Sequence, residues 1–301
     1  MNDPNLSNPS ELFEAYRPLM FSIAYRMLGS AMEAEDIVQD VYLRWQKTAP
    51  EVIRSPKAFL STIVTRLCLN QLESARSRRE TYIGSWLPEP VLTGTEADAA
   101  HAVLAASPAE QAELHESISL AFLVLLEQLT PVERAVFLLR EVFNYDYAEI
   151  AGILDKNEPA CRQLFSRARQ HIASHRPRFK PAPDHHRRLL GEFIQAVSTG
   201  ELNELVSLLA DDVTMWADGG GKVRGAATQT LHGRTAVAQF VLGSTRFLPP
   251  GYQAEIAEVN GQPAAIVRVD HKAVLIIAIE VDGDHVREIR VIGNPDKLKR
   301  V

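Results

Sequence analysis

The feature that most constrains this chain is a pair of helical patterns joined by a tight turn, between residues 146 and 172. Asp146 can cap the first helix, and Glu149 follows it at the spacing of a capping box. Residues 155–157 interrupt the apolar periodicity, and Asn157 is suited to cap a second helix. A short helix, a short turn and a second helix predict a helix-turn-helix, a common DNA-binding unit.

The second of these helices has two faces of different chemistry. Its apolar side chains recur at helical spacing and predict a buried stripe. Its outward side chains are arginine, glutamine and serine, which bind base edges and phosphates in a major groove. They are Arg162, Gln163, Ser166, Arg167 and Arg169. A solvated basic face is the alternative for an isolated helix, but the paired-helix context favours DNA binding.

Charge is distributed unevenly along the 301 residues. The formal net charge of −6 argues against uniform coating of nucleic acid, so a DNA-binding chain of this composition must segregate its basic residues. Residues 91–116 contain five acidic residues and no lysine or arginine, which predicts an acidic linker. Three prolines within residues 176–183 end the next helical stretch. The length and these breaks indicate two to three domains.

Several features bear on the cellular setting of the chain. The first residues lack the basic and apolar stretches of a signal peptide, and even a run as long as 273–279, which no apolar run exceeds, is too short to span a bilayer. Cys68 and Cys161 each lie in an apolar helical pattern and are expected to be reduced core residues. We therefore expect a soluble, cytoplasmic protein without a metal site, a cofactor or a membrane contact.

Another helix is predicted over residues 31–47, where Ser30 and Glu33 have capping-box spacing. Its charged side opposes an apolar side, and spacing alone leaves a solvated face as the alternative to a docking surface. The string AEDIVQDVYLRW at 34–45 nevertheless resembles region 2.2 of extracytoplasmic-function (ECF) sigma factors. In that family this helix docks on the clamp coiled coil of RNA polymerase. The resemblance implies docking or supporting roles for Asp36, Gln39, Asp40, Arg44 and Trp45.

Two further segments extend the resemblance. Residues 55–70 are similar to regions 2.3 and 2.4, which hold the opened −10 element of a promoter. A local basic patch suits that role, and Asn70 stands where many relatives carry aspartate. The residues implied are Arg66, Asn70, Arg76, Arg78 and Arg79. Residues 129–140 resemble the opening of region 4, so the helix-turn-helix becomes the −35 reader, in a domain that also meets the polymerase flap.

Three short strings resemble one ECF group, the SigJ-type factors with a fused SnoaL-like C-terminal domain. They are Trp86, Leu87, Pro88, Glu89 and Pro90; Asp218, Gly219, Gly220, Gly221 and Lys222; and Asn294, Pro295, Asp296, Lys297 and Leu298. In this group the C-terminal domain is viewed as a built-in regulator that contacts the sigma core in place of a separate anti-sigma factor. We expect the first two strings to share one interdomain surface.

The resemblance and the helical and strand patterns together predict a multidomain fold. Two all-α sigma domains, a sigma-2 helical bundle and a sigma-4 helix-turn-helix, precede an α+β SnoaL-like cone of the nuclear transport factor type. The expected boundaries are sigma-2 over 1–90, the acidic linker over 91–116, sigma-4 over 117–180 and the C-terminal domain over 181–301. In the last of these, Asn260-Gly261 and Asp282-Gly283 predict hairpin turns.

Enzymes with cone folds of this type use aspartate or histidine in a pocket. The candidates here are Asp218, His232, Asp270, His271 and His285. Turn positions explain Asp218, Asp270, His271 and His285 without chemistry, and the glycine run lacks the spacing of a phosphate-binding loop. We therefore expect no catalytic residues.

The leading hypothesis is a sigma factor that binds core RNA polymerase and promoter DNA, under control of its own C-terminal domain. Two alternatives stay open at this point. One is a one-component ligand-sensing DNA-binding regulator, which would need no polymerase-docking helix. The other is a SnoaL-like cyclase or isomerase fused to a DNA-binding part.

Overall fold

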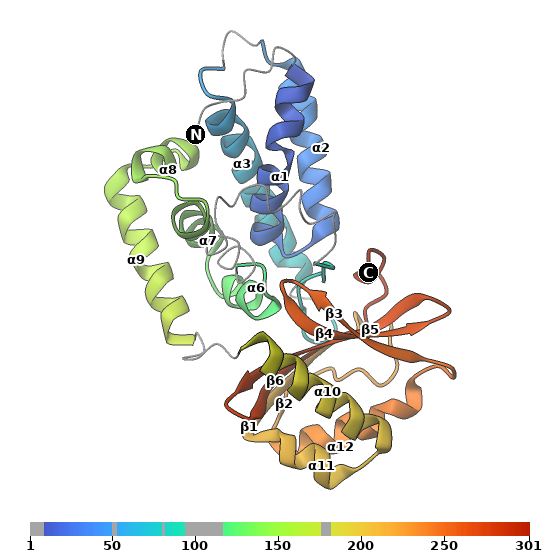
Figure 1. The fold of residues 1–301 in the computed structure, drawn as a ribbon. Helices are drawn as coiled ribbons and strands as arrows, with labels where there is room; N and C mark the ends of the chain where they lie inside the picture. Colours follow the sequence, from blue (N-terminus) through green and yellow to red (C-terminus); the bar gives the residue numbers. More distant parts are fainter. Residues whose placement is uncertain (1–8, 50–52, 80–81, 94–116, 176–181) are drawn as a thin grey trace. The chain divides into compact units, whose positions relative to one another are not determined.

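The structure, a computed structural model, describes residues 9–49, 53–79, 82–93, 117–175 and 182–301 (Figure 1). Contacts between these residues define two compact units. The first comprises the described residues of 1–77 and 117–176, apart from 119–121. The second comprises the described residues of 78–94, 119–121 and 177–301. The segment that contains Trp86–Pro90 therefore belongs to the unit of the C-terminal domain, although we expected it to end the first domain.

The first unit opens with three helices, α1 (Pro9–Leu28), α2 (Ala31–Lys47) and α3 (Pro56–Arg79). The Ser30 side chain accepts a hydrogen bond from the Glu33 amide and so caps α2. Trp45 is buried and lies between the rings of Phe13 and Phe59, at centroid distances of 6.4 and 6.1 Å. These aromatic contacts join the three helices around one core.

The rest of the first unit is also helical. It contains most of α6 (Leu120–Glu127), α7 (Pro131–Phe137), the π-helical turn η2 (Leu138–Val142), α8 (Tyr147–Leu154) and α9 (Glu158–His175). Asp146 and Glu149 form the capping box expected at the start of α8. Asp155 then takes a left-handed conformation and ends that helix. Ile150, Ile153 and Cys161 pack in one buried cluster, which fixes the two helices against each other.

The second unit contains one mixed sheet and three helices. Its helices are α10 (Pro183–Thr199), α11 (Leu202–Leu208) and α12 (Arg234–Ser244), followed by the 3₁₀ turn η3 (Thr245–Phe247). Its strands are β1 (Leu209–Asp218), β2 (Leu231–His232), β3 (Gln253–Val259), β4 (Gln262–Val269), β5 (Lys272–Asp282) and β6 (His285–Ile292). The strand order is β2-β1-β6-β5-β4-β3, and only the β1–β6 pair is parallel.

Turn residues set the hairpins of this sheet, as the sequence predicts. Asn260 and Gly261 both have positive φ between β3 and β4, as do Asp270 and His271 between β4 and β5. Gly283 does the same between β5 and β6. Register shifts in the β4–β5 and β5–β6 pairs add local bends, which increase the curvature of the sheet. The helices and the curved sheet enclose an apolar core (Figure 1).

The predicted fold class is confirmed: two helical domains are followed by an α+β cone domain. Cys68 and Cys161 are buried free thiols. Among the described helices, none has the length and apolar composition needed to cross a bilayer. Within the same residues, no three histidine, cysteine or acidic side chains gather as a metal site would require.

Candidate nucleic-acid and polymerase interfaces

The outward face of α9 carries every residue assigned to the −35 element from the sequence. The Asn157 side chain accepts a hydrogen bond from the Ala160 amide at 2.9 Å and so orients the start of this helix. Cys161 and Ala168 are fully buried on the opposite side. The buried stripe therefore directs the polar side chains to solvent. The exposed residues are Arg162, Gln163, Ser166, Arg167 and Arg169.

Two of these arginines make surface interactions that a phosphate can replace. Arg162 lies 3.1 Å from Glu158 and stacks over the ring of Tyr147, 4.3 Å from its centroid. Arg167 lies 3.4 Å from Glu133 of α7. Both arginines and Glu158 are exposed, whereas the Glu133 side chain is 16% exposed. An exposed ion pair contributes at most about 1 kcal/mol, so Arg162 can exchange Glu158 for a DNA backbone at small cost.

The exposed face of α2 presents Asp36, Gln39, Asp40 and Arg44 to solvent. Trp45 is different, because it is buried and its Nε1 donates to the Pro9 carbonyl at 3.0 Å. It supports the helix from behind and does not form part of the exposed surface.

Sequence reasoning missed two apolar residues on the same face of α2. Met32 and Leu43 are 44% and 47% exposed. Met32, Asp36, Gln39 and Leu43 follow one another at spacings of four, three and four residues, which places them on one stripe of the helix. Large exposed apolar side chains beside carboxylates are typical of a surface that a partner covers. The signal was present in the sequence as this spacing.

On α3 the structure divides the residues assigned to the −10 element. Asn70 is exposed. Arg66 instead donates from Nε to the Ile153 carbonyl at 3.0 Å and from Nη2 to the Gly152 carbonyl at 3.5 Å. Both acceptors belong to the last turn of α8, where the helix dipole favours a cation. The side chains of Arg76, Arg78 and Arg79 lie outside the described part of the structure.

A second contact joins α3 to the residues just before α8. The hydroxyls of Ser61 and Tyr145 are 2.5 Å apart, and the Lys57 ammonium lies 4.7 Å from the centre of the tyrosine ring. Burial raises the pKa of Tyr145 to about 12, so this hydroxyl stays protonated at physiological pH. The contact therefore brings the first half of α3 next to the helix-turn-helix within the first unit.

In the second unit, the three sequence strings converge on the carboxylate of Asp218. This side chain is fully buried at the end of β1. It accepts hydrogen bonds from the Tyr82 hydroxyl at 2.5 Å, the Leu87 amide at 2.8 Å and the Gly220 amide at 3.2 Å. The Lys297 ammonium lies 2.7 Å from the same carboxylate. Asp218 is thus the anchor that holds residues 82–87 on the C-terminal domain.

Lys297 and Asn294 complete this network. The Lys297 ammonium also donates to the Leu87 carbonyl and lies 4.1 Å from the centre of the Trp86 ring. Asn294 donates to the Tyr82 hydroxyl at 2.8 Å. Burial, and then the hydrogen bond to Asp218, raise the pKa of Tyr82 well above its ordinary value.

The glycine run fits closely against the same residues. Gly220 has a φ of +57°, and a Cβ at this position would collide with the side-chain amide of Asn294. Lys222 forms an ion pair with Asp296. Glycine is therefore required at 220 both by the backbone conformation and by the close approach of Asn294.

Residues 91–93 continue along the edge of the sheet. Val91 and Asn260 are joined by two hydrogen bonds, at 3.0 Å from the Val91 amide and 2.8 Å to the Val91 carbonyl. Thr93 donates its amide to the Glu258 carbonyl at 2.8 Å and accepts from the Gly261 amide at 2.8 Å. The segment thus pairs with the end of β3 and the turn that follows.

The residues considered for catalysis do not converge. Asp270 and His271 are at the tip of the β4–β5 hairpin, and His285 is exposed at the start of β6. His232 is exposed and lies 3.3 Å from the Thr214 hydroxyl. Asp218 has its carboxylate engaged in the network described above. No pair of these five side chains is joined by a hydrogen bond.

Comparison with known proteins agrees with this arrangement. The family model for Sigma-70 region 2 matches residues 12–78, and that for Sigma-70 region 4 matches residues 119–172. The first match covers α1–α3, and the second covers α6–α8 and most of α9. The helical domains therefore match regions 2 and 4 of the Sigma-70 family.

Individual relatives narrow the class. The chain is 40% identical to the ECF RNA polymerase sigma factor SigJ of Mycobacterium tuberculosis, over 95% of this chain and 92% of that protein. It is 29% identical to the probable ECF sigma factor SigI of the same organism, over 96% and 94%. The crystal structure of M. tuberculosis SigJ covers 96% of this chain with 39% identity and a TM-score of 0.73. The chain belongs to the ECF RNA polymerase sigma factors, as its sequence predicts.

Proposed function

We propose that this sigma factor docks on core RNA polymerase through the exposed stripe of α2. The support is the combination of two large apolar side chains, Met32 and Leu43, with the carboxylates of Asp36 and Asp40 on one solvent-facing surface. Such a surface fits a helical partner that offers apolar and basic side chains. The clamp coiled coil of the polymerase is the partner implied by the family.

The docking proposal is tested with alanine variants of α2 and a control alanine variant of α1. Asp40→Ala with Arg44→Ala and, separately, Leu43→Ala should each weaken binding to core polymerase in a pull-down or fluorescence titration. Glu14→Ala removes an exposed carboxylate from α1 and is the matched control. Equal affinity of all variants and the control would exclude α2 as the docking helix.

We propose further that α9 reads the −35 element and α3 the −10 element of one promoter. The assignment of α9 to the −35 element rests on its exposed polar face, which lies opposite its buried stripe. Arg66 is held by the carbonyl groups that end α8, so we expect it to exchange these acceptors for phosphates when α3 meets DNA. The hydrogen bonds that Arg66 would give up have neutral carbonyl acceptors, and a charged phosphate binds a guanidinium more strongly than a carbonyl does.

The C-terminal domain is proposed to regulate transcription without a separate anti-sigma factor. Residues 82–93 come shortly after α3 along the chain and are held on the C-terminal domain, so this segment is the covalent link between region 2 and that domain. Breaking the Asp218 network with Lys297→Met should therefore change the rate of promoter-specific transcription in a system of core polymerase, DNA and this protein alone. Arg188→Met, on the exposed face of α10, is the control. An unaltered rate with Lys297→Met would contradict regulation through this segment.

We propose no catalytic role for the domain. Asp218 is the candidate base that borders the interior of the C-terminal domain. Its carboxylate already accepts hydrogen bonds from three donors and pairs with Lys297. A base held in this way has little capacity to accept a proton from a substrate. Turnover of a cyclase or isomerase substrate that is lost on Asp218→Ala would contradict this proposal.

A further inference from the structure

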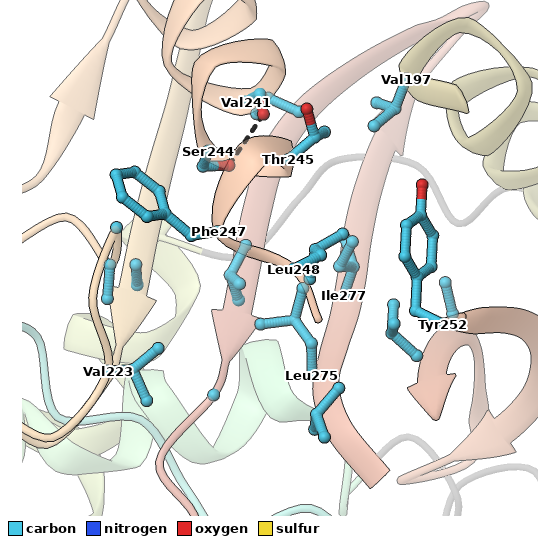
Figure 2. A pocket seen from close by; sticks show the side chains of 18 of the residues that line it. Val197, Val223, Val241, Ser244, Thr245, Phe247, Leu248, Tyr252, Leu275 and Ile277 are labelled. Atoms are coloured by element: carbon cyan, nitrogen blue, oxygen red, sulfur yellow. Dashed lines mark hydrogen bonds between the residues drawn. The ribbon is translucent and has the colours of Figure 1, made fainter. Parts of the chain in front are cut away.

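The C-terminal domain encloses a cavity of about 370 Å³ (Figure 2). Its walls come from α10, α12, η3, strands β1 and β3–β6 and the loop that carries Val223. In β5 the side chains that face the cavity, among them Leu275 and Ile277, keep part of their surface accessible, whereas Ile276 between them is fully buried. This alternation shows that the space lies on one face of the sheet.

The lining offers few free polar groups. Four hydroxyls border it, those of Ser198, Ser244, Thr245 and Tyr252. The first three already donate to a carbonyl in their own segment, and the Tyr252 phenol belongs to a side chain that is 40% exposed. Ser244 donates to Val241 at 2.7 Å, as the dashed line in Figure 2 shows, and Thr245 donates to Leu242 at 2.7 Å. Ser198 donates to Ile194 at 2.8 Å.

Water is a poor occupant of such a space. At about 30 Å³ per molecule the cavity has room for about a dozen waters, and each needs two to four polar partners. Three bonded hydroxyls and the single phenol of Tyr252 cannot supply them. A volume of this size with an apolar lining is instead typical of a site for a small organic molecule.

The mouth of the cavity is apolar as well. Val223, Phe247 and Tyr252 line it and are 37%, 46% and 40% exposed, which makes them three of the large apolar side chains that the described surface leaves uncovered. Phe247 packs closely on Gly225, where a Cβ would collide with its ring. An apolar entrance that leads to an apolar interior favours a ligand that is apolar along its length.

Charge is scarce at this site. The charged side chains in the lining are Asp218 and Arg224. The carboxylate of Asp218 is bound by its own network, and Arg224 is exposed to solvent. An ionised group in the interior would have no partner and would bear the full cost of desolvation. We infer that the cavity is a binding site for a small, uncharged and mainly apolar molecule.

The test uses the full chain and N-phenyl-1-naphthylamine, a neutral apolar fluorophore, excited where tryptophan does not absorb. We expect saturable binding of one probe per chain. Val197→Trp and Leu275→Trp place an indole in the cavity from opposite walls and should each weaken binding at least tenfold. Gln195→Trp adds the same group to the exposed face of α10 and should bind like the unaltered chain. Equal affinities for all four proteins, or no saturable binding, would overturn the inference.

Two further measurements keep the outcome decisive. Circular dichroism melting checks that each variant is folded. If a Trp variant is not folded, Val197→Phe takes its place and should weaken probe binding at least threefold. Displacement of the probe by naphthalene and by 2-naphthoate tests the charge of the ligand. The neutral compound should displace it at least tenfold more effectively, and equal or better displacement by the carboxylate would refute the uncharged class. Polymerase is absent from both experiments, so their outcome is independent of the proposed role in transcription.

Discussion

Replacing Lys297 by methionine tests the Asp218 network most sharply. The change keeps an unbranched apolar stem and removes the cation that lies 2.7 Å from a fully buried carboxylate. Loss of one partner of a buried ion pair costs about 3–5 kcal/mol, because the remaining charge is left buried. Asp218 would keep three neutral donors, from Tyr82, Leu87 and Gly220, which places the expected loss at the lower end, at ~3 kcal/mol. That loss corresponds to about two orders of magnitude in the unfolding equilibrium.

The assay is urea unfolding followed by tryptophan fluorescence, with hydrogen exchange at the Leu87 amide as a local probe. Adding Asp218→Asn to the Lys297→Met variant removes the buried carboxylate charge that has lost its partner, and should restore part of the free energy of unfolding. Lys222→Met breaks an exposed ion pair with Asp296 and should cost less than about 1 kcal/mol. A loss below about 1 kcal/mol for Lys297→Met, or a double variant no more stable than this single one, would refute the reasoning.

Three other predictions concern separate parts of the chain. Burial raises the pKa of Glu280 to about 7; the charge of Arg290 opposes this shift and that of Glu288 adds to it. The free energy of unfolding should therefore fall as pH rises from about 4.5 to about 7. Glu280→Gln should flatten that dependence in urea titrations at several pH values. Gly220→Ala should lower the free energy of unfolding by more than about 1 kcal/mol, because alanine is strained at positive φ and its Cβ meets Asn294. In the same assay Gly243→Ala, within α12, should be neutral or stabilising by up to about 1 kcal/mol. Arg167→Ala should lower affinity for promoter DNA and reduce the salt slope by about 1, while Arg188→Ala should change neither; an unchanged slope for Arg167→Ala would exclude a phosphate contact there.

Local signals made much of the fold predictable. The capping box at Asp146 and Glu149 depends on residues three apart, and the hairpin turns depend on adjacent residues such as Asn260 and Gly261. Amphipathic spacing similarly predicted which side of α9 is exposed. These features are fixed by short stretches of chain, so the sequence contains their cause directly.

Long-range features were harder to predict. Asp218 was explained as a turn residue, and its bond to the Gly220 amide agrees with that reading. Its contacts with Tyr82, Leu87 and Lys297 join residues between 79 and 136 positions away, and no local pattern encodes them. The resemblance to cone folds implied a pocket, but its lining was equally hidden, because residues such as Leu275 and Ile277 have the same alternation whether they face a core or a pocket.

Run-off transcription with core RNA polymerase is the most direct measurement of the central claim. With this protein and genomic DNA, we expect discrete transcripts whose start sites share −10 and −35 elements. The same reaction with Asp40→Ala and Arg44→Ala should lose these transcripts, and Glu14→Ala should retain them. Transcripts that do not depend on the protein, or that persist unchanged in the double variant, would contradict a sigma factor that docks through α2.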